Sequence, residues 1–122
     1  MTTEEFIQCV GRAVYEPSID GTIGILEQPP GRKPHERLVA LSHWFNQLPT
    51  EQRAYVQSVI ELVAHGTVFG MLAVLDGVRS VNRVGEEGTL ELRHVTREHS
   101  TLLNDPEGML MHDLFSGQFP CL

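Results

Sequence analysis

The chain has 122 residues, which fits one domain, so residues 1–122 are expected to fold as a single small domain. Its formal net charge of −7 argues against a nucleic-acid partner, because phosphate contacts need clustered lysine and arginine. The same charge allows a basic protein partner. The polar, acidic start of the chain lacks the basic and apolar regions of a secretory signal, which predicts a cytoplasmic location.

The first predicted helix runs from about Thr3 to Tyr15. Thr2 and Glu5 have the spacing of a capping box, and apolar residues recur at helical spacing behind them. The stretch 16–34 holds seven Pro and Gly residues, so a long connection is expected there. A connection of this length is either mobile or a contact surface.

Two further helices are predicted around Pro49. Apolar spacing indicates one helix from Pro34 to Leu48, and Thr50 is expected to cap the next one. The break between them is only two residues long, which favours an antiparallel pair of helices.

The third helix continues into the longest apolar run of the chain, residues 59–78. Between Thr67 and Leu75 no polar face remains, which predicts a central helix that is buried on all sides. Gly66 and Gly70 are four residues apart on one face, where a neighbouring element is expected to approach closely. Because charged and polar residues bracket the run, it is too short for a membrane span, and no membrane is expected as a partner.

The C-terminal third reads as strands followed by a short helix. Residues 90–95 alternate with period two and residues 101–103 form a second short run, so a β-hairpin is predicted. The stretch Val78–Val84 alternates weakly, and whether it is strand or helix stays open. Asp105 and Pro106 are placed to start a last helix that ends near Gly117. The predicted fold is α+β: a helical hairpin around a buried central helix, a small antiparallel sheet and a short C-terminal helix.

No known catalytic motif is present in the sequence, and the histidines and carboxylates of the last third match no metal-ligand spacing. We therefore expect no catalytic residue, no metal and no cofactor. One alternative polar site combines Glu61 and His65, one helical turn apart, with His112. Ordinary histidines at the edge of a core explain this pattern more simply.

The sequence favours a non-catalytic, acidic protein-binding module. One specific hypothesis is a bacterial immunity protein that neutralises a cognate toxin by occluding its active site, with a basic toxin domain as the partner. A small enzyme or metal-binding protein that uses the His/Asp/Glu-rich C-terminal segment is one alternative, and a homo-oligomeric structural protein is another. The candidate partner-binding residues are acidic: Glu86, Glu87, Glu91, Glu98, Asp105, Glu107 and Asp113.

Overall fold

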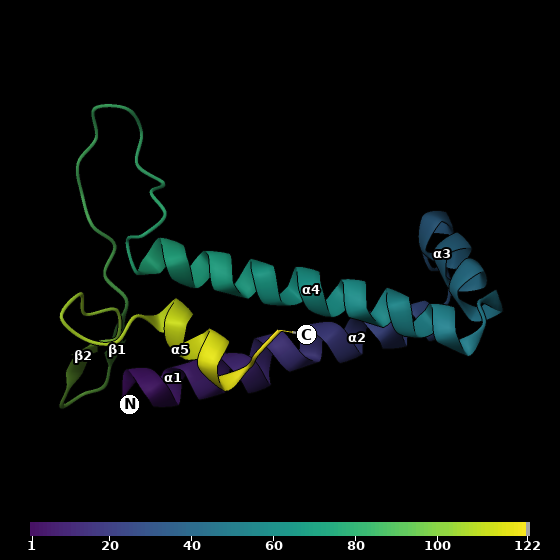
Figure 1. The fold of residues 1–122 in the computed structure, drawn as a ribbon, viewed down its shortest axis with the longest axis horizontal. Helices are drawn as coiled ribbons and strands as arrows, with labels where there is room; N and C mark the ends of the chain where they lie inside the picture. The colour runs from purple at the N-terminus through teal and green to yellow at the C-terminus, as the bar shows by residue number, and fades with distance from the viewer. Residues whose placement is uncertain (122) are drawn as a thin grey trace.

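The computed structural model describes residues 1–121 and begins with a long helical rod. The rod consists of α1 (Thr3–Val10), the π-helical segment η1 (Gly11–Tyr15) and α2 (Glu16–Glu27) (Figure 1). The predicted capping box is confirmed at its start. The Thr2 hydroxyl accepts the Glu5 backbone N–H at 3.1 Å, and the Glu5 carboxylate accepts the Thr2 N–H at 2.9 Å.

The prediction of a connection over residues 16–34 is wrong for residues 16–27, which form α2. Pro17 lies in the first turn of α2, where its missing N–H leaves no orphaned donor. The turn before Pro17 is π-helical, and in it the Glu16 N–H donates to the carbonyl of Gly11. Ile19 and Leu26 are buried, so tertiary packing stabilises a helix whose own propensity is low.

Helix α3 (Glu36–Gln47) packs against α2. The Asn46 side-chain amide donates to the carbonyl of Glu27 at 3.0 Å, and Phe45 is buried. The chain turns at Pro49 as expected, but α3 crosses the end of the next helix steeply instead of running back along it (Figure 1). The predicted antiparallel pairing of these two helices is therefore wrong. The antiparallel partner of the central helix is the rod of α1 and α2.

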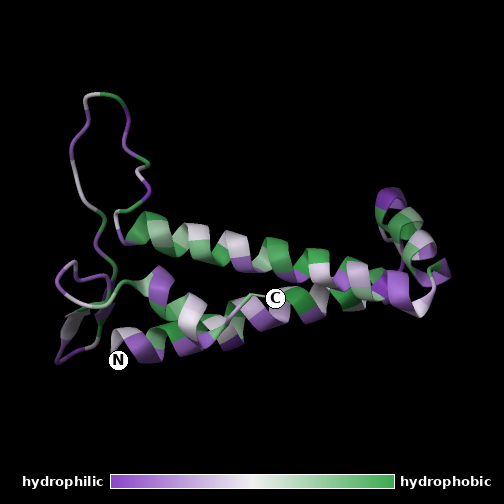
Figure 2. Ribbon diagram, viewed as in Figure 1, coloured by the Kyte–Doolittle hydropathy of each residue, from purple (hydrophilic) through white to green (hydrophobic). Residues whose placement is uncertain are grey.

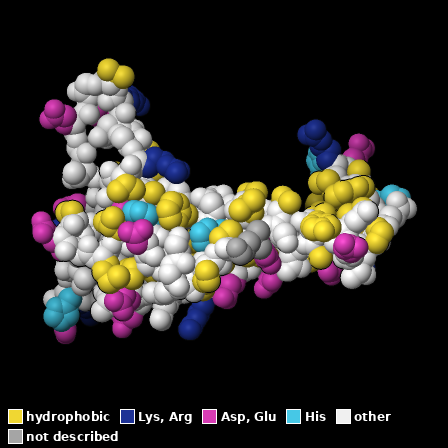
Figure 3. All heavy atoms as spheres, viewed as in Figure 1, with side chains coloured by type: hydrophobic (Ala, Val, Ile, Leu, Met, Phe, Trp, Pro, Cys, Tyr) yellow, Lys and Arg dark blue, Asp and Glu magenta, His cyan; other side chains and the backbone are white. Residues whose placement is uncertain are grey.

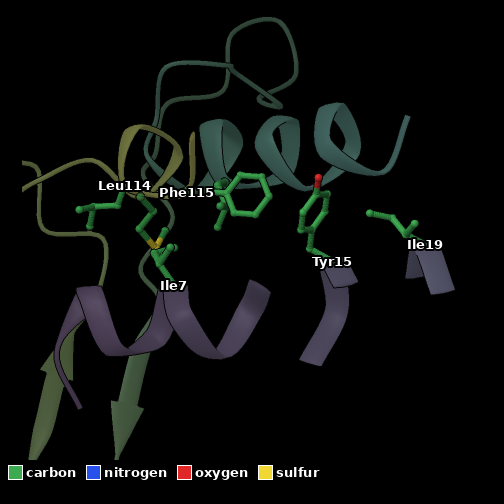
Figure 4. Close-up of a cluster of buried hydrophobic side chains, with 7 residues drawn as sticks. Ile7, Tyr15, Ile19, Leu114 and Phe115 are labelled. Carbon is green, nitrogen blue, oxygen red and sulfur yellow. The ribbon is translucent and has the colours of Figure 1, made fainter. Parts of the chain in front are cut away.

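Helix α4 (Thr50–Leu75) is the central element. It has no side-chain cap; Pro49 occupies the cap position and Thr50 is the first helical residue, which corrects the predicted capping by Thr50. One side of α4 packs on the core, whose buried members come from the rod, from α4 and from α5 (Figure 4). These members are Ile7, Tyr15, Ile19, Leu72, Met111, Leu114 and Phe115. The opposite side of α4 is exposed, so the prediction of a helix buried on all sides is wrong.

The remaining elements lie at the end of the molecule where α4 finishes. A projecting loop, residues 77–92, leads to the antiparallel strands β1 (Arg93–Val95) and β2 (Ser100–Leu102), with Arg93 opposite Leu102 (Figure 1). Residues 78–84 are neither strand nor helix. Helix α5 (Met111–Gln118) begins later than predicted and packs between α1 and α4. The predicted α+β class, with a small antiparallel sheet and a short C-terminal helix, is confirmed.

Candidate interaction surface

The uncovered side of α4 carries a strip of large apolar side chains. We define the α4 outer face as Tyr55, Val59, Leu62, Val63, Gly66 and Met71. The five non-glycine side chains are between 56% and 66% exposed. Single exposed apolar residues are ordinary, but a contiguous strip marks an interaction surface. Figure 2 shows that apolar residues continue along most of α4.

The α4 outer face is also uncharged. Residues 54–75 contain one formally charged side chain, Glu61. Glu61 is half-buried; its Oε1 accepts the Gln57 side-chain amide at 3.1 Å, and its charge acts on the phenol of Tyr15 in the core. Glu61 therefore belongs to the side that faces the rod, and the outer face has no group that needs water.

Helix α3 extends this surface at the start of α4. Val39, Leu41 and Trp44 are 46–50% exposed. In the space-filling view, apolar side chains gather at the end of the molecule where α3 meets α4 (Figure 3). Exposed tryptophan and tyrosine are enriched among the residues that anchor protein interfaces.

By length and composition, α4 is the one helix among residues 1–121 that could cross a membrane. Only 17% of the residues in its most apolar window are buried. The inner side of the same helix contacts η1, α2 and α5, which carry charged residues on their own outer sides. A helix held in this way offers one face to a partner and does not stand free of its neighbours.

The acidic residues predicted to bind a partner are all exposed and lie at the end of the molecule opposite α3 (Figure 1). Their charge is partly offset there. The Glu91 carboxylate pairs with Arg93 at 3.2 Å, and Asp105 uses its Oδ1 to accept the Glu107 N–H at 3.0 Å. The same segments also carry Arg79, Arg83 and Arg97. The structure therefore brings Glu86, Glu87, Glu91, Glu98, Asp105, Glu107 and Asp113 to one end, interleaved with arginines.

Asp76, at the end of α4, is a key polar residue that the sequence did not single out. Its side chain is 1% exposed. Oδ1 accepts the Met111 N–H at 3.0 Å, and Oδ2 accepts the His112 N–H at 2.9 Å and lies 2.6 Å from His112 Nδ1. Asp76 thus caps α5 from a distance, the role that Asp105 was expected to fill. The Asp76-Gly77 pair after an apolar helix was the available signal.

A second buried polar residue, Asn104, joins the hairpin to α4. Its Nδ2 donates to the carbonyls of Leu75 at 2.6 Å and Leu90 at 2.8 Å, and its Oδ1 accepts the Leu92 N–H at 2.8 Å. These three bonds satisfy backbone groups that no helix or strand ladder would otherwise pair. Asn104 is therefore a structural residue.

The alternative polar site does not converge on one point. His65 Nε2 is 2.9 Å from the carbonyl of Phe119, and its ring lies 4.9 Å from that of Phe115. His112 is held by Asp76, and its Nε2 faces Asp113 at 3.4 Å. Within residues 1–121, no hydrogen bond or ion pair joins Glu61 to either histidine. Both imidazoles are explained by packing and hydrogen bonding.

Burial raises the pKa of the Tyr15 hydroxyl, and the nearby acidic groups of Cys121, Glu61 and Glu16 raise it further. The ring contributes to a row of edge-on aromatic contacts, with Phe115 at 5.2 Å and His65 at 5.8 Å. A neutral phenol in this place fits a packing role.

Within residues 1–121, no three His, Cys, Asp or Glu side chains are placed to hold one metal ion. A cavity of about 400 Å³ lies between the end of α4, the loop and the hairpin. Its polar lining includes Asp76, Asn82 and Asn104, whose side chains are engaged in hydrogen bonds within the chain.

Comparison with known proteins gives no family for this chain. No model of a protein family matches it, and neither do the curated proteins or the solved structures that were searched.

Proposed function

We propose that this chain is a non-catalytic protein-binding module whose contact surface is the α4 outer face, extended by Leu41 and Trp44 of α3. The observation that carries the proposal is the exposure of five large apolar side chains on one uncharged strip. Burying such a strip yields about 25 cal/mol per Å² of apolar surface, so covering it with another polypeptide is strongly favourable.

The polar groups of the fold support binding more than catalysis. A catalytic acid or base must have a free site facing substrate. The Asp76 carboxylate holds α5, Asn104 holds the hairpin, and His65 bonds to the backbone of Phe119. The Asp76 carboxylate, the Asn104 amide and the His65 imidazole are thus committed to holding the fold together.

A protein partner also suits the charge better than a lipid surface does. Helices that lie on membranes combine an apolar face with flanking lysine and arginine, which attract anionic lipid. This chain has nine basic and sixteen acidic residues, so an anionic surface repels it. The proposed location is the cytoplasm.

Neutralisation of a basic bacterial toxin is the alternative within the same class. It is supported by the net charge of −7 and by the acidic residues gathered at the hairpin end. The two surfaces differ in their dependence on salt. Binding through the acidic end should weaken steeply between low and high ionic strength, whereas binding through the α4 outer face should not.

The decisive experiment places a photo-reactive benzoylphenylalanine at Val63, on the α4 outer face, or at Gln8, an exposed and neutral helical position on α1. Irradiation in the cells that make the protein should link position 63, and not position 8, to one discrete polypeptide. Absence of a linked polypeptide at position 63, or equal linking at both positions, would overturn the proposal.

A further inference from the structure

We infer that the occupant of the α4 outer face is a second copy of this chain, with the two α4 helices packed antiparallel about a two-fold axis near Val63. The inference rests on the proposed function and specifies its partner. Closed two-fold dimers are the commonest soluble oligomers, and such an interface uses one self-complementary patch twice.

Charge is the first argument for self-association here. Each copy carries a net charge of −7, so two copies repel one another wherever their acidic surfaces meet. The α4 outer face has no formal charge, because Glu61 faces the rod. Contact through this face keeps the acidic surfaces of the two copies apart.

The second argument is the arrangement of side chains along the strip. Val59, Val63, Gly66 and Gly70 follow one another at spacings of four, three and four residues, which places them in one line on the helix. No atom beyond the helix lies within 4 Å of the Cβ position at Gly66, so a second backbone has room to approach there.

An antiparallel arrangement also matches the two ends of the strip. About an axis at Val63, Tyr55 of one copy comes nearly level with Gly70 of the other. The Arg79 guanidinium lies over Gly70. Arg79 forms no ion pair within the described part of the chain. A tyrosine ring packs favourably on a guanidinium.

The size of the surface is the third argument. A stable interface takes about 800 Å² from each partner. The strip from Tyr55 to Met71 is about 24 Å long at 1.5 Å per residue. The exposed Leu41 and Trp44 widen it at each end of the antiparallel pair. The dimer therefore needs the α3 side chains in its contact as well as the α4 outer face.

The test measures the mass of the full chain in solution by light scattering and sedimentation. At micromolar concentration the wild type should have twice the chain mass of 13.7 kDa. Val63→Lys places two ammonium groups beside the axis and should weaken the dimer at least tenfold. Gln8→Lys adds the same charge on α1 and should leave the dimer intact. Circular dichroism confirms that both variants remain helical.

A second measurement tests the register. In a Cys9→Ser, Cys121→Ser background, Val63→Cys should form a disulfide-linked dimer on oxidation, and Gln8→Cys should not. A monomeric wild type that forms no such link would overturn the inference.

The remaining outcomes separate this inference from the proposed function. If the wild type is monomeric and position 63 links to a different polypeptide, the self-association is wrong and the binding function stands. If the monomer instead floats with phosphatidylcholine vesicles and Val63→Lys abolishes flotation, the occupant is a membrane and both are wrong.

Discussion

The carboxylate of Asp76, at the end of α4, lies 2.6 Å from Nδ1 of His112 and accepts the backbone N–H of the same residue at 2.9 Å. The Asp76 side chain therefore both caps α5 and orients the imidazole ring of His112. The contact spans 36 positions in the sequence and joins the two helices that bracket the hairpin. Since α5 supplies Met111, Leu114 and Phe115 to the core, its placement determines the core.

Asp76→Ala should therefore destabilise the fold. The substitution leaves two backbone N–H groups and the His112 ring without their partner, and we expect a loss of about 2–4 kcal/mol in the free energy of unfolding. Asp113→Ala removes a carboxylate from the same helix at an exposed position and should cost little. Urea unfolding followed by circular dichroism measures both. Equal stability of the two variants would show that the Asp76 cap is unimportant.

Asn104→Ala should loosen the hairpin from α4. The change deletes three hydrogen bonds to backbone groups of Leu75, Leu90 and Leu92, and we expect a loss of about 2–3 kcal/mol. Asn82→Ala, in the exposed loop, deletes one side-chain bond to Gly88 and serves as the control. Amide hydrogen exchange should speed up in β1 and β2 for Asn104→Ala alone.

Gly11→Ala should disrupt the packing between η1 and the end of the chain. A Cβ at this position would lie 1.8 Å from the Phe119 ring, so the ring must leave its place. We expect a loss of about 1–3 kcal/mol from the displaced packing. Gly21→Ala, on α2, meets nothing within 4 Å and should stabilise the helix by about 1 kcal/mol. Thermal unfolding distinguishes the two, and adding Phe119→Ala should relieve the clash at position 11.

The sequence was informative where structure is local. The capping box at Thr2 and Glu5 and the hairpin near Arg93 depend on near neighbours, and both were predictable. Helix α2 was missed because Pro17, Gly21 and Gly24 oppose helix formation. Only packing against residues far away in the sequence overrides these local preferences. The role of Asp76 was missed for a related reason, since its partners lie 35 and 36 residues away.

The prediction that α4 is buried on all sides was wrong for its outer face. A helix that is apolar all round is normally buried on all sides in the functional protein. Within one chain, the rod and α5 cover only the inner side. The apolar pattern thus predicts that the outer face is covered, but no local feature of the sequence identifies what covers it.

Alkaline pH should destabilise the fold through Tyr15. The phenol has a raised pKa in the folded chain, because burial and nearby negative groups disfavour tyrosinate. The folded state therefore holds this proton more tightly than the unfolded state does. The resulting stabilisation is complete below the usual tyrosine pKa of about 10 and is lost as pH rises through the folded value. In the Val63→Lys monomer, Tyr15→Phe should remove this contribution from the pH dependence of unfolding, whereas Tyr55→Phe, which is exposed there, should not.

Protein concentration should also change the stability, because a dimer that dissociates on unfolding is stabilised by mass action. The wild-type midpoint of thermal unfolding should rise as the concentration is raised. Val63→Lys should remove this rise while leaving the inner side of α4 intact. Leu72→Ala, on that buried inner side, should lower the stability by about 2–5 kcal/mol and keep the concentration dependence. A midpoint that is independent of concentration in the wild type would contradict the dimer, whatever the two variants do.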